Sequence, residues 1–206
     1  PDGMLVGGGY DASLRLWDPR TGAELAVLSG HEAGINALVM LPDGRVLSAS
    51  SDQTVRVWDL PRGTEAFAPM PTRFGDPRAW AVCLAFSPDG QRVVTASNDN
   101  AARVWSTAGV LLATLKGHTA TVWSAVFSSD GQRVVTASKD GTARLWSIEG
   151  RLLATFKSDG GVNSAVFSPD GRYVVTASSD KAARVWPVDS ELVMRRLEKA
   201  TSVCLD

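Results

Sequence analysis

The residues best suited to do chemistry in this chain surround its two histidines. Each histidine is followed by a hydroxyl residue and then by an aspartate, which gives the sets His31, Ser48 and Asp52, and His118, Thr136 and Asp140. A histidine, an aspartate and a serine or threonine are the residue types of a nucleophilic hydrolase site. The elements that position these residues decide whether they meet a substrate or serve the fold.

The same residue types recur in a repeat that runs through most of the chain. Five stretches place a Trp six residues after an Asp, at Asp11 and Trp17, Asp52 and Trp58, Asp99 and Trp105, Asp140 and Trp146, and Asp180 and Trp186. Each unit also has Pro-Asp-Gly or Ser-Asp-Gly upstream. Self-similarity at about 40 to 45 residues is typical of arrays and propellers, in which one unit does not bury its own faces.

Within a unit, apolar residues alternate with a period of two, which predicts strands. Val55 and Val57 share one face of a predicted strand, and Thr54, Arg56 and Trp58 share the other. Four such short strands occur in each unit, and four antiparallel strands joined by tight turns make one propeller blade. We therefore predict an all-β chain, a β-propeller of four-stranded antiparallel blades with units at about 1–28, 29–70, 71–115, 116–156 and 157–188, the first and last incomplete.

These motifs resemble the WD-repeat (beta-transducin repeat) family. The resemblance is carried by the hydroxyl residue four positions before the turn Asp and by the pairs Gly30-His31, Gly117-His118, Trp17-Asp18 and Trp58-Asp59. Unit three has Pro77 and unit five has Ser158 where the family has His, and unit one has Gly7 at the hydroxyl position. The Ala-, Val- and Arg-rich composition resembles that of bacterial members.

The resemblance assigns the candidate hydrolase groups to the framework. It implies two hydrogen-bonded tetrads, His31, Ser48, Asp52 and Trp58, and His118, Thr136, Asp140 and Trp146. A nucleophile has to face a substrate and an oxyanion site, whereas tetrad side chains would lie inside a blade. A partly buried Asp at a tight turn needs hydrogen-bond donors, and the tetrad supplies them. We therefore expect the tetrads to hold the blades together, and we expect no enzyme.

An Arg lies two residues before each repeated Trp, at Arg15, Arg56, Arg103, Arg144 and Arg184. It falls on the polar face of a predicted strand in all five units, including those without His. We expect this Arg to pair with nearby acidic groups of the framework rather than to clamp a phosphate.

Composition argues against several other classes of function. A formal net charge of −1 and a pI near 6.2 leave no electrostatic footprint for nucleic acid or an anionic membrane. No apolar run approaches the roughly 20 residues of a membrane span. Cys83 and Cys204 lie outside any metal-ligand spacing, which favours free thiols, no metal site and a reducing, cytoplasmic location. There is no P-loop and no Cys/His cluster, so we expect no cofactor.

The resemblance also marks positions that face partners. In WD-repeat proteins, the residues three and five positions after the His and the residue before the turn Asp point to the top rim. Carried over, the rim residues are Tyr10, Asn36, Trp80, Val82, Asn98, Thr121, Trp123, Lys139 and Asn163. Trp80 and Trp123 lie outside the repeated framework, and Trp is over-represented in binding hot spots. The alternative is that each of them packs against a neighbouring blade.

We therefore expect a non-catalytic scaffold for protein-protein interaction that presents the rim of the propeller to protein or peptide partners. Two Trp, several Asn and one Lys suit a peptide better than a charged polymer. The alternative is a ligand-sensing regulatory module of a larger signalling enzyme, such as a kinase or ATPase.

Two segments depart from the repeat, and the repeat itself is short. Residues 60–80 contain several Pro and are expected to form an elongated loop rather than another strand. Residues 189–206 lose the period of two and predict a short amphipathic C-terminal helix that serves as a tail or linker. A seven-bladed ring needs about 280 residues at this period. We therefore expect an incomplete ring, closed by missing blades or by a second copy.

Overall fold

The computed structural model describes residues 4–40, 44–60, 64–65, 70–71 and 79–188. Their strands form five antiparallel sheets, numbered here as blades 1 to 5 in chain order. Blade 1 contains β1 (Leu5–Gly8), β2 (Ser13–Trp17) and β3 (Glu24–Ser29). Blade 2 contains β4 (Ile35–Met40), β5 (Val46–Ser50), β6 (Thr54–Asp59), β7 (Thr64–Glu65) and β8 (Met70–Pro71).

The other three blades follow the same plan. Blade 3 contains β9 (Ala81–Phe86), β10 (Arg92–Ser97), β11 (Ala101–Ser106) and β12 (Leu111–Lys116). Blade 4 contains β13 (Val122–Phe127), β14 (Arg133–Ser138), β15 (Thr142–Ser147) and β16 (Leu152–Lys157). Blade 5 contains β17 (Val162–Phe167), β18 (Tyr173–Ser178) and β19 (Ala183–Pro187).

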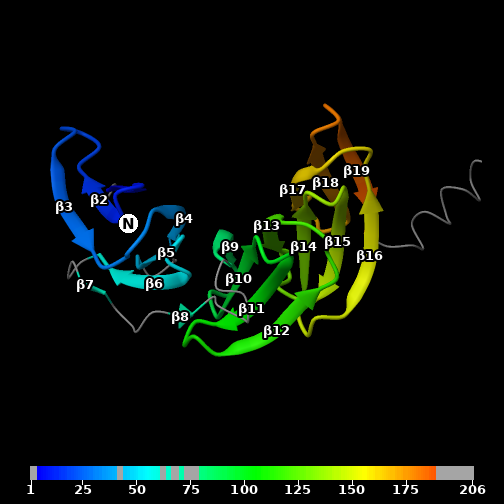
Figure 1. Cartoon of the computed structure of the whole chain (residues 1–206), viewed down its shortest axis with the longest axis horizontal. Coiled ribbons are helices and arrows are strands. Elements are labelled where there is room, and N and C mark those ends of the chain that lie inside the picture. Colours follow the sequence, from blue (N-terminus) through cyan, green and yellow to red (C-terminus); the bar gives the residue numbers. More distant parts are fainter. Residues whose placement is uncertain (1–3, 41–43, 61–63, 66–69, 72–78, 189–206) are drawn as a thin grey trace, which may run out of the picture.

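The blades follow one another around an open arc (Figure 1). The first strands β4, β9, β13 and β17 line the inside of the arc, and the last strands β3, β12 and β16 lie on its outside. Blades 1 and 5 stand on separate arms of the arc. The described residues therefore form a row of propeller-like blades and no closed ring.

Each blade buries one sheet face against the next blade. Between blades 3 and 4, for example, the small or β-branched residues of one sheet meet the first strand, the second strand and the repeated Trp of the other: Val94, Ala96, Ala102, Val104, Val122, Ala125, Val134 and Trp146. Trp58, Trp105 and Trp186 occupy the same place at the other three junctions. The repeated Trp is therefore a junction residue, and burial obliges its indole N–H to find a partner.

A three-residue hairpin carries the Asp from the second strand to the third. The residue after the Asp has a positive φ in every blade, at Ala12, Gln53, Asn100, Gly141 and Lys181. A type I turn followed by a left-handed residue suits the twist of antiparallel strands. It also leaves the Asp carboxylate free to turn back toward the sheet, where Ser13 N and Thr54 N donate to it.

The prediction of an all-β chain is confirmed for the described residues, which contain no helix able to span a bilayer. The last strands reach Ser29, Pro71, Lys116 and Lys157, one residue past the predicted unit ends. The predicted C-terminal helix at 189–206 lies outside the described residues. The prediction of a loop without strands over residues 60–80 is wrong, because β7 and β8 both pair with β6. The open edge of β6 requires backbone partners, and that requirement outweighs the Pro-rich composition.

Candidate functional site

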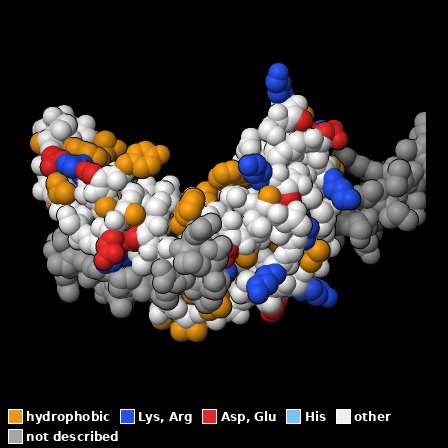
Figure 2. Space-filling view, in the orientation of Figure 1, with side chains coloured by type: hydrophobic (Ala, Val, Ile, Leu, Met, Phe, Trp, Pro, Cys, Tyr) orange, Lys and Arg blue, Asp and Glu red, His pale blue; other side chains and the backbone are white. Residues whose placement is uncertain are grey.

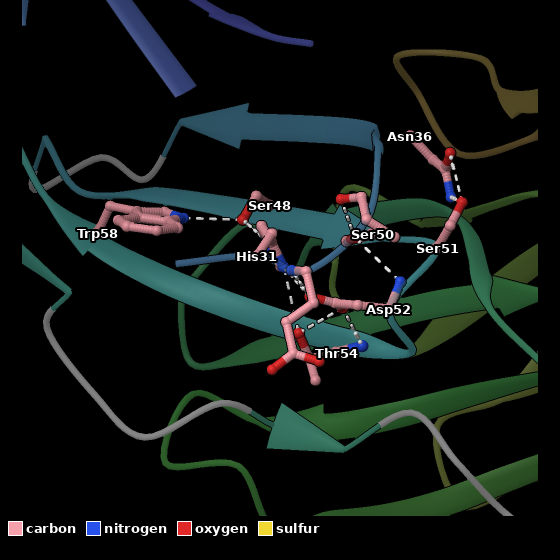
Figure 3. Close-up of polar contacts among 10 residues, drawn as sticks. His31, Asn36, Ser48, Ser50, Ser51, Asp52, Thr54 and Trp58 are labelled. Atoms are coloured by element: carbon pink, nitrogen blue, oxygen red, sulfur yellow. Dashed lines mark hydrogen bonds and ion pairs between the residues drawn. The ribbon is translucent and has the colours of Figure 1, made fainter. Parts of the chain in front are cut away.

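In blade 2 the four tetrad side chains form one hydrogen-bonded chain (Figure 3). His31 lies just before β4, with Nδ1 2.7 Å from Asp52 Oδ2 and Nε2 2.6 Å from Ser48 Oγ. The Trp58 indole N–H donates to the same Ser48 oxygen at 2.7 Å. The segment before the first strand is thereby tied to β5, to the hairpin turn and to β6.

Blade 4 repeats this arrangement with a threonine. His118 Nδ1 lies 2.8 Å from Asp140 Oδ2, and His118 Nε2 lies 2.7 Å from Thr136 Oγ1. The Trp146 indole N–H donates to Thr136 Oγ1 at 2.9 Å. An ionised carboxylate only accepts, so Nδ1 carries the imidazole proton and Nε2 accepts from the hydroxyl.

Burial and hydrogen bonding together set the charges of the tetrads. Burial alone would raise the pKa of Asp140, but hydrogen bonds from Thr142, from the Thr119 N–H and from His118 lower that pKa to about 2. The pKa of Asp52 is also lowered, because its hydrogen bonds outweigh its burial. Burial lowers the pKa of His118 although Asp140 opposes the shift. At neutral pH the aspartates are therefore ionised and His118 is neutral.

The tetrad hydroxyls are closed to solvent. Ser48 and Thr136 have no exposed surface, and each hydroxyl oxygen accepts the N–H of a Trp that is itself buried in a junction. A substrate in solution has no path to these oxygens in this structure. The arrangement can tie strands together, but it does not present a nucleophile.

Blades 3 and 5 hold the turn Asp with the repeated Arg instead of a His. Arg103 Nη2 lies 2.5 Å from Asp99 Oδ2, and Arg184 Nη1 lies 2.6 Å from Asp180 Oδ2. The Trp indole keeps its hydroxyl partner in both blades, because Trp105 and Trp186 donate to Thr95 and Thr176 at 3.0 Å. The Arg thus supplies the charge-assisted donors that His supplies in blades 2 and 4.

Blade 1 is a third variant, at the outer end of the arc. Arg15 Nη2 lies 2.7 Å from Asp11 Oδ2, and Arg15 Nη1 lies 2.9 Å from Glu24 Oε2. Gly7 stands at the hydroxyl position, where an added Cβ would lie only 2.8 Å from the Trp17 ring. The ring of Trp17 therefore occupies the space that a hydroxyl residue takes in the other blades.

The Gly of the Gly-His pair has a steric role. Gly117 has a φ of +151°, and a Cβ there would collide with Arg144 Nη1. Arg144 lies against the chain at this point and its Nε donates to Thr142 Oγ1 at 3.4 Å. The expected Arg–acid ion pair is thus formed in blades 1, 3 and 5, whereas in blade 4 the nearby acid Asp140 is held by His118.

Sequence reasoning missed one residue of the histidine blades. Thr54 Oγ1 donates to Asp52 Oδ1 at 2.7 Å, and Thr142 Oγ1 donates to Asp140 Oδ1 at 2.6 Å. The signal is visible in the sequence, because a Thr stands two residues after the Asp only in the two units that contain His. Blades 3 and 5 have Ala101 and Ala182 at this position.

Four of the expected rim residues occupy β-bulges in the first strands. Asn36, Val82, Trp123 and Asn163 are each skipped in the pairing register between the first and second strands. A bulge releases one residue from the ladder and re-aims its side chain. Asn36, Trp123 and Asn163 are exposed and Val82 is half-buried.

The remaining rim residues pair across the top of each blade. The backbone N–H before the turn Asp donates to the carbonyl three residues after the His position, as from Asn98 to Trp80 at 3.3 Å and from Lys139 to Thr121 at 2.9 Å. The rim also crosses between blades, because Asn36 Nδ2 donates to the Ala81 carbonyl at 3.1 Å. The expected rim positions therefore form one continuous surface.

The rim aromatics differ from the framework tryptophans. Trp80 is 39% exposed and Trp123 is 40% exposed, while Tyr10 projects almost entirely into solvent. No hydrogen-bond acceptor for the indole N–H of Trp80 or Trp123 occurs among the described residues, whereas Trp58 and Trp146 are satisfied by hydroxyls. Figure 2 shows hydrophobic side chains gathered inside the arc, over β9 and β13.

Metal and thiol chemistry find little support in the described part of the chain. No cluster of three or more His, Cys, Asp or Glu side chains suited to a metal ion occurs there. Cys83 is a half-buried free thiol whose pKa is raised by burial, which disfavours the reactive thiolate. Cys204 lies outside the described residues.

Comparison with known proteins gives the repeat its family. The family model described as WD domain, G-beta repeat, matches residues 22–59, 72–106, 109–147 and 150–187. The first and the last two matches begin near the last strand of one blade and end with the third strand of the next, so the sequence repeat is offset from the structural blade.

One curated protein with similar sequence is the Telomerase protein component 1 of Mus musculus, 30% identical over 130 residues. The match covers 60% of this chain but only 5% of the length of that protein. The family match, by contrast, covers more than half of this chain in four successive copies with the geometry described above. The chain belongs to the WD-repeat family.

Proposed function

We propose that this chain is a non-catalytic scaffold whose rim binds a protein or peptide partner. The observation that carries the proposal is the pair of exposed tryptophans, Trp80 and Trp123, on neighbouring blades. Both offer a large apolar ring and an indole N–H without an acceptor in the described structure. A flat aromatic surface with free donors is the kind of site at which protein interfaces concentrate their binding energy.

The chemistry around the two tryptophans favours a peptide. Exposed amides lie on the same surface at Asn36 and Asn163, and the one charged rim residue is Lys139. Amide groups read both donors and acceptors of a peptide backbone, whereas a polyanion requires several cations. The similarity to a protein named as a component of telomerase is also compatible with work inside an assembly.

The absence of catalysis is part of the proposal. The only groups that resemble a hydrolase are the tetrads, and their hydroxyls are buried and already bonded to an indole. A location in the cytoplasm is proposed with the same standing, from the absence of charged or apolar surfaces suited to a membrane.

The experiment compares capture by three immobilised forms of the chain from an extract of its source. These are the wild type, the rim variant W80A/W123A, and the matched control L112A/L153A. The control truncates two exposed apolar side chains on the outer strands of the same two blades. We expect a protein that the wild type and the control retain and that the rim variant loses.

Direct binding of that protein in purified form decides the outcome. Hot-spot residues contribute about 2 kcal/mol or more, so each Trp→Ala change should weaken binding by more than about tenfold. The melting temperature should stay that of the wild type, because both rings are partly exposed. Equal retention by the rim variant and the wild type would refute rim binding.

A further inference from the structure

The junctions between blades repeat one pattern of complementary faces. The second and third strands of one blade give the exit face, which at the junction of blades 2 and 3 consists of Leu47, Ala49, Val55 and Val57. The following blade gives the entry face, which there consists of Ala81, Leu84, Val93 and Trp105. Four junctions in this chain are built in this way.

Blade 5 carries an exit face that no described residue covers. Its register pairs Val175 with Val185 and Ala177 with Ala183, as Val135 pairs with Leu145 and Ala137 with Ala143 in blade 4. Val185 is 63% exposed, whereas the residues at its position in blades 1 to 4 are exposed by 3% or less: Leu16, Val57, Val104 and Leu145. The residues of blade 5 therefore have the composition of a buried junction on an open surface.

Blade 1 carries the opposite, open face. Leu5 pairs with Trp17 as Val46 pairs with Trp58, which places Leu5 on the entry face. Leu5 is 58% exposed, whereas the residues at its position in blades 2 to 5 are exposed by 2% or less: Val46, Val93, Val134 and Val174. The two ends of the arc thus expose the two halves of the same junction.

We propose that the exit face of blade 5 binds the entry face of blade 1 in a second copy of this chain, so that copies associate head to tail. The contact continues a series of four junctions already built within one copy, and it covers Val185 of one copy and Leu5 of the next. The two faces of a single copy stand on separate arms of the arc, which leaves them free to meet other copies (Figure 1). Such a contact is heterologous, so it grows into rings or filaments.

The contact is smaller than an internal junction. Blade 1 has no first strand among the described residues, so it lacks counterparts of Ala81 and Leu84. Association is therefore expected to be reversible and to increase with protein concentration.

Sedimentation velocity over a wide concentration range tests the proposal with two variants, V185D and L5D. Both residues are largely exposed in one copy, so an Asp there leaves the blade intact while placing an uncompensated charge in the contact. Each variant alone keeps only one competent end. We expect the average mass of the wild type to rise with concentration, and each variant to remain monomeric or lose most of its association.

The mixture of the two variants is the decisive arm. V185D retains an intact entry face and L5D retains an intact exit face, so an equimolar mixture should form heterodimers and stop there. L112D, which charges an exposed Leu on an outer strand, should associate as the wild type does, and so should W80A/W123A. The second of these controls separates this proposal from rim binding.

Three results would overturn the proposal. The first is a wild type that stays monomeric at every concentration. The second is association that survives unchanged in V185D and L5D, and the third is a mixture that forms no heterodimer although thermal melting shows that both variants are folded.

Discussion

The blades with histidine and the blades with arginine solve the same problem in different ways. In both kinds an aspartate at the hairpin turn faces back into the blade and needs donors. His31 and His118 reach that aspartate from outside the sheet and also hold a hydroxyl, which in turn holds the junction Trp. In blade 3, Arg103 reaches Asp99 along its own strand, and the hydroxyl serves the Trp alone.

The difference shows what the histidine adds. It links the segment before the first strand to the rest of the blade, and it couples the aspartate to the junction through one continuous chain of hydrogen bonds. The arginine satisfies the aspartate but leaves the Trp and its hydroxyl as a separate pair. Three substitutions and one pH series can separate these roles.

The largest effect is expected in the buried arginine pair. The side chain of Arg103 is 3% exposed and that of Asp99 is 9% exposed, so Arg103→Ala leaves a carboxylate buried without its main charge partner. Removing one member of a buried pair costs about 3–5 kcal/mol of unfolding free energy. Chemical denaturation checks this value.

Arg15→Ala in blade 1 is the matched control for that substitution. Its pair with Asp11 has the same sequence spacing but is far more exposed, at 38% and 52%. We expect little change in stability there, because water solvates both groups. Equal losses at Arg15 and Arg103 would show that burial does not set the strength of these pairs.

A smaller difference is expected between two threonines. Thr136→Val orphans both the Trp146 indole N–H and His118 Nε2, whereas Thr95→Val orphans only the Trp105 indole N–H. An unsatisfied buried group costs about 1–3 kcal/mol, so Thr136→Val should exceed Thr95→Val by about 1 kcal/mol or more. Thermal and urea unfolding of both variants measure the difference, and identical losses would mean that the histidine contact adds nothing.

The smallest effect is expected in the pH dependence. The pKa of His118 is lower in the folded chain than in the unfolded chain, so the unfolded chain binds more protons in the window below its ordinary value of 6.5. The stability contribution of His118 is therefore complete above that value and is lost as pH falls through the folded pKa. Asp140, with a pKa of about 2 against an ordinary 3.8, adds a second loss below about pH 4.

Urea unfolding from pH 7.5 down to pH 3 follows both losses. No single group changes stability by more than about 1.4 kcal/mol per pH unit. His118→Gln should flatten the upper part of the curve and leave the arginine blades unaffected. The same slope in the variant and the wild type near pH 6 would exclude His118 as its source.

The strands were readable from the sequence because their burial alternates. Val55 and Val57, which the period of two places on one face, are both buried in the junction with blade 3. The positions of His31, Ser48 and Asp52 came from the resemblance to WD repeats and not from periodicity. The match of the family model supports that source.

The remaining features depend on relations between strands that a single sequence does not display. The bulges at Asn36 and Trp123 arise where the register of two strands shifts, and no local residue preference marks such a shift. The strands β7 and β8 form because the open edge of β6 needs partners, against the preference of a Pro-rich segment. The pairing of Arg103 with Asp99 was expected as a type, but its near-complete burial depends on neighbouring blades.

The separation between a framework that stabilises and a rim that binds is tested most directly with the captured partner. Its affinity is measured for Thr136→Val, at a temperature where that variant is folded, and for W80A/W123A. We predict that Thr136→Val melts earlier and binds as the wild type does, while the rim variant melts as the wild type does and loses binding. Lost affinity in folded Thr136→Val, with full affinity in the rim variant, would contradict the separation.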